Sequence, residues 1–258
     1  MSESKHAGAT SGMDYGRYLQ LEELLALQTP QSSPEHPDEL LFIVVHQASE
    51  LWFKVLLHEL STLVGALQQF DTMRALLAIQ RVNVLTEIIA QQLSSLDTLP
   101  PQRFAQFRGY LGSSSGSQSV QFRAIEATAG LRDPHFMAAI TEHGDPPPAV
   151  KAALERPTLQ ALAEALIAHE GVTLESLYTG PGPTPLFLVV EGLLEFEQRF
   201  ARWRFLHVQL VERIIGPGTG GTGGTLGAKY LARTVSQRFF PSLWAVRSEF
   251  YGRGSTQY

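Results

Sequence analysis

A histidine stands at position 207, where the surrounding pattern calls for an apolar side chain. Apolar residues on either side of it recur at alternating steps of four and three, the spacing of one face of a long helix over residues 189–216. The other members of that face are Val189, Leu193, Phe196, Phe200, Trp203, Leu210 and Ile214. A buried imidazole must satisfy its ring nitrogens or lose its charge. His207 can therefore bind a metal through a neutral nitrogen, within a face suited to a large flat cofactor, or it can be a core histidine bonded to a carbonyl.

A second histidine lies in the apolar first half of a long helix that the sequence predicts over residues 38–69. Phe42, His46, Glu50 and His58 fall close to one line along that helix. His46 can be a half-buried residue bonded to Glu50. A His-x-x-x-Glu pair can also ligate a metal ion, but that needs a second pair of ligands, which is not evident in the sequence.

A Ser/Gly-rich loop over residues 112–119 separates a short helix, expected at 102–110, from a helix that starts near Ser119. Free backbone N–H groups and hydroxyls at a helix N-terminus form an anion site or a site for oxygen ligands. Arg108, just before the loop, offers a planar donor fork for a carboxylate. The alternative is a flexible linker with surface arginines. Aromatic residues on both flanks favour a packed loop: Phe104, Phe107, Tyr110 and Phe122.

A Gly/Thr-rich loop over residues 218–227 follows the helix that carries His207. It lacks the lysine and the spacing of a P-loop. Glycine removes the side-chain barrier to a close ligand, so this loop can still approach a bound molecule.

The composition narrows the classes of protein and of site. The chain has 258 residues, 44% hydrophobic and 17% charged, with no cysteine and a net charge of −5. The absence of cysteine excludes disulfides, iron–sulfur clusters and thiolate ligation of a haem, so a metal site must use His, Asp or Glu. No basic block indicates nucleic-acid binding. No apolar run approaches the length that spans a bilayer, so we expect no membrane partner and a cytoplasmic location.

Every strong pattern in the chain has helical period, which predicts an all-α fold. We expect a flexible tail over residues 1–12 and a single helical domain over 13–258. Besides the segments above, we expect helices at 14–28, 71–96 and 228–240 and short helices within 133–186. The first helix should turn Tyr15, Tyr18 and its leucines inward, and Asn83 should lie at a solvated edge of the third.

Four blocks of this sequence resemble the tryptophan 2,3-dioxygenase family. They are HQASELWFK at 46–54, FRGYLGSSSGSQSVQFRAIE at 107–126, FARWRFLH at 200–207 and GTGG at 221–224 before the Tyr230–Leu231 pair. The blocks occur in the order of the family, and only the middle of the chain, about 130–185, looks shorter and unrelated. Four ordered blocks are a far more specific signal than any single histidine.

The resemblance implies an all-helical fold of the haem-dioxygenase type that holds one haem b. His207 would be the proximal iron ligand. His46 would lie on the distal side, near dioxygen and the indole N–H. The residues that would border the haem are Leu111, Ser115, Gly116 and Ser117.

The resemblance also implies a site for an indole amino acid. Phe42 and Phe104 would line the indole pocket, and Arg108 would clamp the substrate carboxylate. Thr222 would bind the amino or carboxylate group, with Thr219 as the other candidate because the loop length differs. Tyr15 and Tyr18 would reach into the site of a neighbouring subunit, so a homotetramer is expected.

Departures from the family pattern leave the reaction open. Ser117 stands where the family has a bulky aromatic residue, Phe104 where a tyrosine is usual, and Leu206 where the family has arginine. A smaller residue near the haem could admit a larger substrate such as a methylated tryptophan, or water. The expected reaction is dioxygenation of the indole C2–C3 bond to an N-formylkynurenine-type product. The alternatives are monooxygenation to an oxindole, a haem-binding protein without turnover, and a helical scaffold whose histidines are structural.

Overall fold

The computed structural model describes residues 14–142, 144–220 and 228–254. Within these ranges the chain forms helices and no strand, which confirms the predicted all-α class. The first half of the chain contains α1 (Tyr15–Leu19), α2 (Leu21–Ala26), α3 (Glu39–Gln68), α4 (Thr72–Gln92), α5 (Pro101–Arg108) and α6 (Val120–Ala129). The 3-10 turns η1 (Leu93–Thr98), η2 (Gly109–Leu111) and η3 (Gly116–Gln118) lie between them.

The second half of the chain is dominated by α11 (Pro185–Ile215), the helix predicted around His207. It follows α7 (Pro134–Thr141), α8 (Pro148–Leu154), α9 (Leu159–His169) and α10 (Leu174–Thr179), and it precedes α12 (Ala228–Thr234) and α13 (Pro241–Gly254). Thr184 caps the start of α11 by accepting a hydrogen bond from the N–H of Phe187, and Pro185 occupies the first helical position, where no N–H is needed. Gly216, at φ 86°, ends the helix.

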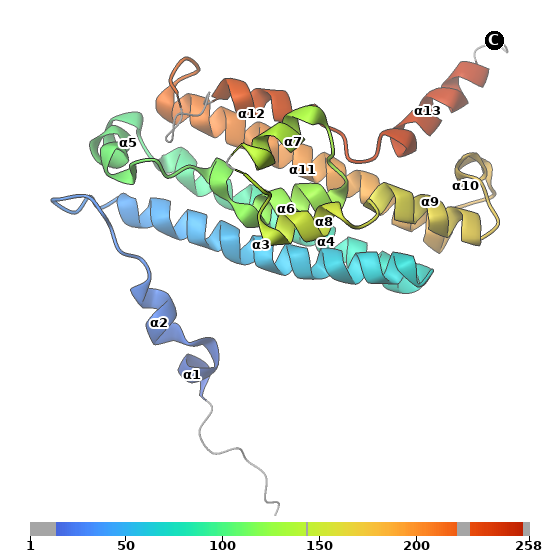
Figure 1. The fold of residues 1–258 in the computed structure, drawn as a ribbon, viewed down its shortest axis with the longest axis horizontal. Helices are drawn as coiled ribbons and strands as arrows, with labels where there is room; N and C mark the ends of the chain where they lie inside the picture. The colour runs from blue at the N-terminus through green and yellow to red at the C-terminus, as the bar shows by residue number, and fades with distance from the viewer. Residues whose placement is uncertain (1–13, 143, 221–227, 255–258) are drawn as a thin grey trace, which may run out of the picture.

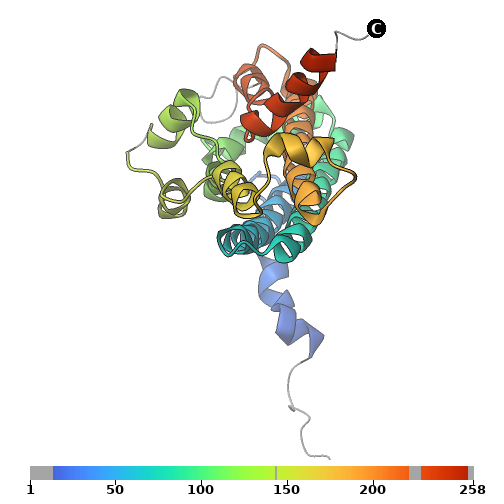
Figure 2. The same ribbon diagram turned by 90° about the vertical axis from the view of Figure 1, so that its right-hand side faces the viewer.

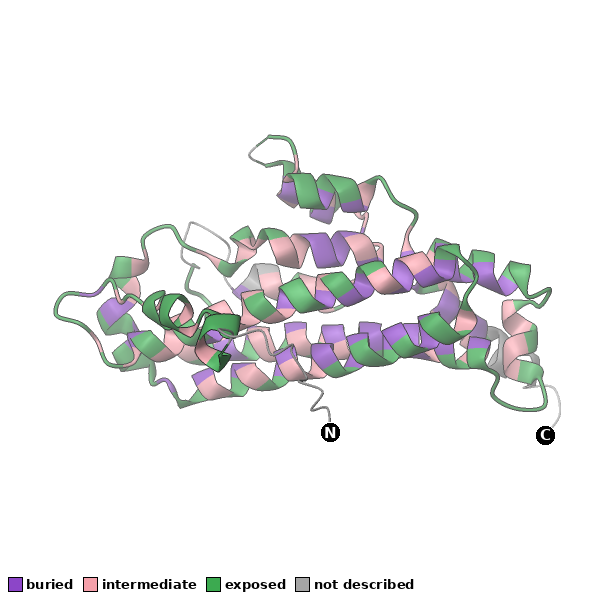
Figure 3. Cartoon of the chain, turned by 90° about the horizontal axis from the view of Figure 1, so that it is seen from below, coloured by how far each residue is buried: buried purple, intermediate pink, exposed green. Residues whose placement is uncertain are grey.

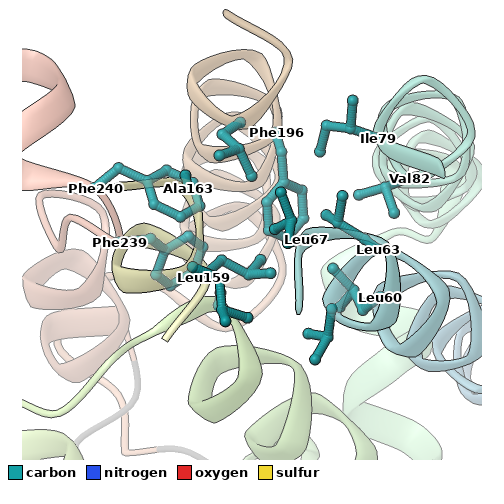
Figure 4. Close-up of a cluster of buried hydrophobic side chains, with 14 of the residues drawn as sticks. Leu60, Leu63, Leu67, Ile79, Val82, Leu159, Ala163, Phe196, Phe239 and Phe240 are labelled. Atoms are coloured by element: carbon teal, nitrogen blue, oxygen red, sulfur yellow. The ribbon is translucent and has the colours of Figure 1, made fainter. Parts of the chain in front are cut away.

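Three long helices, α3, α4 and α11, lie side by side and form the body of the molecule (Figure 1). Helices α6 and α9 pack against α3, and buried residues gather where the long helices face one another (Figure 3). The main core joins leucines of α3 to α4, α9, α11 and the segment before α13 (Figure 4). Its labelled members are Leu60, Leu63, Leu67, Ile79, Val82, Leu159, Ala163, Phe196, Phe239 and Phe240.

The helices α4 and α11 approach each other closely at Gly192. A Cβ atom added there would lie 2.9 Å from Cγ2 of Ile79, so only glycine fits without a shift. Asn83, one turn along α4, donates to the backbone carbonyl of Gly192 at 3.0 Å and is buried. The expectation that Asn83 lies at a solvated edge is therefore wrong, because the partner that satisfies it comes from a helix far along the chain.

The N-terminal segment departs from the predicted inward helix. Gln20, at φ 51°, breaks it into α1 and α2, and neither helix has a buried residue. Both helices project away from the body in two views at right angles (Figures 1 and 2). Tyr15 and Tyr18 are 74% and 73% exposed, so the expectation that they face inward is wrong for this chain taken alone.

Two other predicted helices are shorter in the structure than the sequence indicates. The helix expected at 71–96 ends at Gln92 and continues as the 3-10 turn η1, and the helix expected at 228–240 ends at Thr234. The division into a tail over 1–12 and one domain from residue 13 lies partly outside the described residues and stays a prediction.

One helix, α3, is long and apolar enough to cross a bilayer by length and composition alone. The expectation that no apolar run approaches that length is wrong on this criterion. The helix packs against α4, α6 and α9, and 17% of its apolar window is buried.

Candidate functional site

A cavity of about 600 Å³ is lined by residues of several helices, among them Arg108 of α5 and Leu231 of α12. Helix α5 lies at one end of the bundle (Figure 1). The cavity lining includes Phe53 of the main core and members of a second apolar cluster formed by Val45, Leu93, Leu96, Leu99, Phe104, Phe107 and Leu210. Residues of α3, α5, η3, α6 and α11 line it. A cavity of this size between helices is typical of cofactor and small-molecule sites.

His207 lines this cavity from α11, one turn after Trp203, whose ring centre lies 5.2 Å from the imidazole. Burial, and then the charge of the nearby His46, lowers the pKa of His207 to about 4, so its ring is neutral at pH 7. Within the described residues no side chain or carbonyl makes a hydrogen bond to this ring. The interpretation of His207 as a core histidine bonded to a carbonyl therefore finds no support.

His46 lines the same cavity from α3. Its Nδ1 lies 2.7 Å from the carbonyl oxygen of Phe42, and because a carbonyl only accepts, Nδ1 carries the proton. In the neutral ring Nε2 is then an acceptor. Burial lowers the pKa of His46 below its usual value, against the opposing effects of the Phe42 carbonyl and the Glu50 carboxylate. The neutral form with a free acceptor nitrogen is therefore favoured.

Glu50 is not the partner of His46. Its carboxylate and its backbone carbonyl both accept from Nε2 of Gln121, at 2.8 and 2.9 Å. The interpretation of His46 as bonded to Glu50 is thus wrong, because the described hydrogen bond of the imidazole goes to the Phe42 carbonyl and none of those described joins it to Glu50. Among the described residues no group of three His, Asp or Glu side chains could hold a metal ion on its own. A site built on the His-x-x-x-Glu pair therefore lacks the further ligands it would need.

Arg108 ends α5 at the cavity wall, and its Nη2 donates to the carbonyl oxygen of Gly220 at 2.6 Å. The guanidinium therefore lies where the Gly/Thr-rich loop begins. Thr222 of that loop falls outside the described residues. Thr219 is described but does not line the cavity.

The Ser/Gly loop lies beside the cavity, which residues 114–119 line, but none of residues 112–119 is buried, so the expected packing of the loop is not confirmed. Ser115 and Ser117 share a hydroxyl–hydroxyl hydrogen bond of 2.9 Å, and the backbone N–H of Ser115 donates to the side chain of Gln118 at 3.1 Å. Ser119 caps α6 by accepting from the N–H of Phe122 at 3.1 Å. These turns leave hydroxyls and backbone groups at the cavity wall.

Most of the sequence-predicted side chains therefore meet in one place. The cavity is lined by Phe42, His46, Phe104, Arg108, Leu111, Ser115, Gly116, Ser117 and His207. Tyr15 and Tyr18 are not brought to it, because α1 projects away from the body.

Sequence reasoning missed a buried ion pair in the cavity wall. Arg204 donates to Glu126 at 2.6 Å and to the carbonyl of Thr234 at 3.0 Å, and both members of the pair are buried. This one guanidinium joins α6, α11 and the end of α12. The sequence gives little indication of this ion pair, because Arg204 and Glu126 lie on different helices and no spacing rule links them.

Sequence reasoning also missed Glu39, because an acidic residue in the first turn of a helix is common and gives no sign of a further role. Its carboxylate accepts from the backbone N–H groups of Gln31 and Ser32 at 2.8 and 3.0 Å and lines the cavity. Burial by itself raises the pKa of Glu39, but the hydrogen bonds from Ser32 and Gln31 outweigh it, so the pKa lies below its usual value.

Sequence comparison connects this geometry to known proteins. The model of the family described as tryptophan 2,3-dioxygenase matches residues 1–145 and 162–250. The tryptophan 2,3-dioxygenase of Kineococcus radiotolerans is 40% identical over 265 residues, which cover 93% of this chain and 92% of the relative. Those of Bacillus cereus and Herpetosiphon aurantiacus are 36% and 38% identical, over 96% and 93% of this chain and 97% and 99% of theirs. The unmatched residues 146–161 lie inside the stretch 130–185, so the dissimilar part is narrower than expected.

Proposed function

Because this chain belongs to the tryptophan 2,3-dioxygenase family, we propose that it is a haem-dependent enzyme that inserts both atoms of dioxygen across the indole C2–C3 bond of L-tryptophan. The observation that carries the proposal is a single cavity with a neutral histidine from α11, a second from α3 and an arginine at its wall. The names of the relatives favour insertion of two oxygen atoms over the one-atom alternative. A binding protein without turnover would need neither Arg108 nor His46.

The residues of the cavity fit a haem. His207 offers a neutral ring nitrogen with no competing hydrogen bond within the described residues, which is the form that ligates iron. The aromatic rings of Phe53, Phe122 and Trp203 supply flat apolar walls beside it. When bound, the haem supplies the reduced iron at which dioxygen reacts. We propose that Leu111, Ser115, Gly116 and Ser117 border it.

The substrate is held, in this proposal, by contacts at both ends. Nε2 of His46 accepts the indole N–H, while Phe42 and Phe104, whose ring centres lie 5.5 Å apart, wall the indole. Arg108 donates its planar fork to the carboxylate. Thr222, or Thr219 in its place, binds the amino or carboxylate group. The protein's contribution is mostly orientation, because the electron-rich indole needs no deprotonated carbon to react.

We also propose a homotetramer in which Tyr15 and Tyr18 reach into a neighbouring subunit's site. Two exposed apolar stripes support association, one on α3 and one on α4. They consist of Leu40, Val44, Leu51 and Val55 on α3 and of Met73, Leu77 and Val84 on α4. A cytoplasmic location stays a prediction.

The product decides the reaction. Ferrous haem-loaded protein is mixed with L-tryptophan without oxygen, isotopically labelled dioxygen is added, and the product is weighed by mass spectrometry. Two labelled oxygens with an opened indole ring are expected. One labelled oxygen in an intact ring system would replace dioxygenation by oxindole formation, and the absence of any product would leave only a binding protein.

A further inference from the structure

Residues 27–38, called the strap here, connect α2 to α3 and lie against the cavity, which Thr29 and Gln31 line. In the structure α3 holds the strap at two points. Glu39 accepts from the N–H groups of Gln31 and Ser32, and Gln47 donates to the carbonyl of Leu27 at 3.1 Å. The strap is therefore fixed on the side of α3.

The strap is also joined to α5 and η2 by three polar contacts. Arg103 binds Asp38 with both Nε and Nη2, the latter 2.9 Å from Oδ1. Nε2 of His36 donates to the side-chain oxygen of Gln106 at 3.0 Å, consistent with its Nδ1 accepting from the N–H of Asp38. The hydroxyl of Tyr110 donates to the carbonyl of Ser33 at 2.8 Å. The three residues that hold the strap from α5 and η2 are therefore Arg103, Gln106 and Tyr110. Residues at this spacing share one helix face.

Away from the strap, α5 is held by apolar packing and by the hydrogen bond from Arg108, at its last residue, to the carbonyl of Gly220. Phe104 and Phe107 are buried in the second apolar cluster. Apolar packing is not directional, so two rings by themselves leave α5 some freedom to rotate about its axis. Arg108 ends this helix, and a small rotation would swing its guanidinium away from the cavity. Directional contacts on the opposite face are what can fix that rotation.

The exposure of the Asp38–Arg103 pair argues against a role in stability. The two side chains are 25% and 45% exposed, and ion pairs at that level contribute little to folding. A two-point guanidinium–carboxylate contact, in contrast, defines the orientation of both partners. The pair is therefore suited to setting geometry.

We propose that Asp38 and Arg103, supported by His36 and Tyr110, are positioning residues that aim the Arg108 guanidinium at the carboxylate of the bound amino acid. This inference rests on the proposed function, since it assumes that Arg108 holds that carboxylate. It assigns a role in substrate specificity to a connecting segment whose own residues take no part in the proposed reaction.

The test compares two ligands of haem-loaded protein, L-tryptophan and tryptamine, which lacks the carboxylate. Their equilibrium dissociation constants are measured for the unchanged protein, Arg103→Ala, Arg108→Ala and the double variant. Arg103→Ala is expected to weaken L-tryptophan binding roughly tenfold, equal to about 1.4 kcal/mol, without weakening tryptamine binding. The double variant should bind L-tryptophan no more weakly than Arg108→Ala, because Arg103 acts only through Arg108.

Two further variants separate positioning from general damage. Exchanging the charges, as Asp38→Arg with Arg103→Asp, should restore most of the L-tryptophan affinity. Arg81→Ala removes an ion pair of 3.0 Å with Glu59 outside the cavity lining and should change neither constant. The proposal is overturned if Arg103→Ala weakens both ligands equally or neither of them. If Arg108→Ala weakens both ligands equally, Arg108 does not bind the carboxylate and the proposed function loses that contact. If Arg108→Ala weakens only L-tryptophan binding while Arg103→Ala changes neither constant, only the positioning role of Arg103 is excluded.

Discussion

Among the described residues, one ring nitrogen of His46 has a hydrogen-bond partner and the other has none. Nδ1 is tied to the carbonyl of Phe42, so Nε2 is the atom that can meet a substrate N–H in the cavity. We predict that 1-methyl-tryptophan, which has no indole N–H, binds more weakly than L-tryptophan by about 1 kcal/mol, the net strength of one hydrogen bond. In His46→Ala that difference should vanish while haem content is kept. Spectral titration of both ligands gives the two constants, and an unchanged preference in the variant would exclude contact between His46 and the indole nitrogen.

Glu39 should make the attachment of the strap depend on pH. Its pKa in the folded chain lies below the usual 4.5, so its contribution to stability is complete above that value and is lost as the pH falls through the lowered pKa. Glu39→Gln should therefore cost about 1 kcal/mol in unfolding free energy at pH 7. The cost should shrink as the pH falls from about 4.5, where the carboxylate of the unfolded chain takes up a proton, through the lowered pKa of the folded chain. Urea unfolding of both proteins at several pH values measures this, and a cost that grows toward acid would contradict the sign.

At the scale of single residues, the sequence predicted the side chains that would contact ligands in the cavity better than the buried ion pairs and hydrogen bonds that hold the cavity wall in place. His207, His46 and Arg108 stand out because an imidazole in an apolar face and a cation beside a Ser/Gly loop are unusual where they occur. Glu126 and Arg204 do not stand out, since a buried pair is recognised only when two distant helices are known to touch. Glu39 does not stand out either, because acidic residues are common in the first turn of a helix.

At the scale of elements, the long helices could be predicted because their apolar periods run over many turns. The helix expected at 38–69 spans Glu39–Gln68, and α11 carries its predicted face inward. The break at Gln20 could not be foreseen, because a left-handed glutamine carries no sequence signal such as glycine would give. The inward face expected for α1 also failed, since an amphipathic pattern does not say which surface it is meant to cover.

The close approach of α4 and α11 at Gly192 leaves no room for an added side-chain atom. Gly192→Ala would place a Cβ 2.9 Å from Ile79, a fully buried side chain that cannot move freely. Overpacking of this kind costs about 1–3 kcal/mol. Gly65→Ala on α3 is the matched control: nothing lies within 4 Å of the added Cβ, and alanine's better helix propensity should leave the protein equally or more stable. Urea unfolding ranks the two, and equal stabilities would remove the close crossing as a constraint.

At the scale of the molecule, the N-terminal helices and two apolar stripes are left uncovered by the rest of the described residues. The helices α1 and α2 have no buried residue and project from the body (Figure 2). The apolar stripes on α3 and α4 are exposed along several turns. Exposed apolar patches of this extent mark surfaces that bind other proteins, and in the proposed assembly the partner is a second copy of the chain.

The proposed exchange of N-terminal helices predicts complementation between two inactive proteins. A chain that lacks residues 1–26 keeps the strap and every described cavity residue, so it should fold and bind haem yet lose turnover. His207→Ala keeps α1 with Tyr15 and Tyr18 but should lose the haem and with it turnover. Mixed oligomers, formed by dissociating and reassociating the two, should recover activity, because an intact helix from one subunit can complete the haem-loaded site of another. Light scattering follows the assembly and product formation follows the rescue. Recovered assembly without recovered activity would mean that the N-terminal helices serve association alone, and full turnover by the shortened chain would place Tyr15 and Tyr18 outside the site altogether.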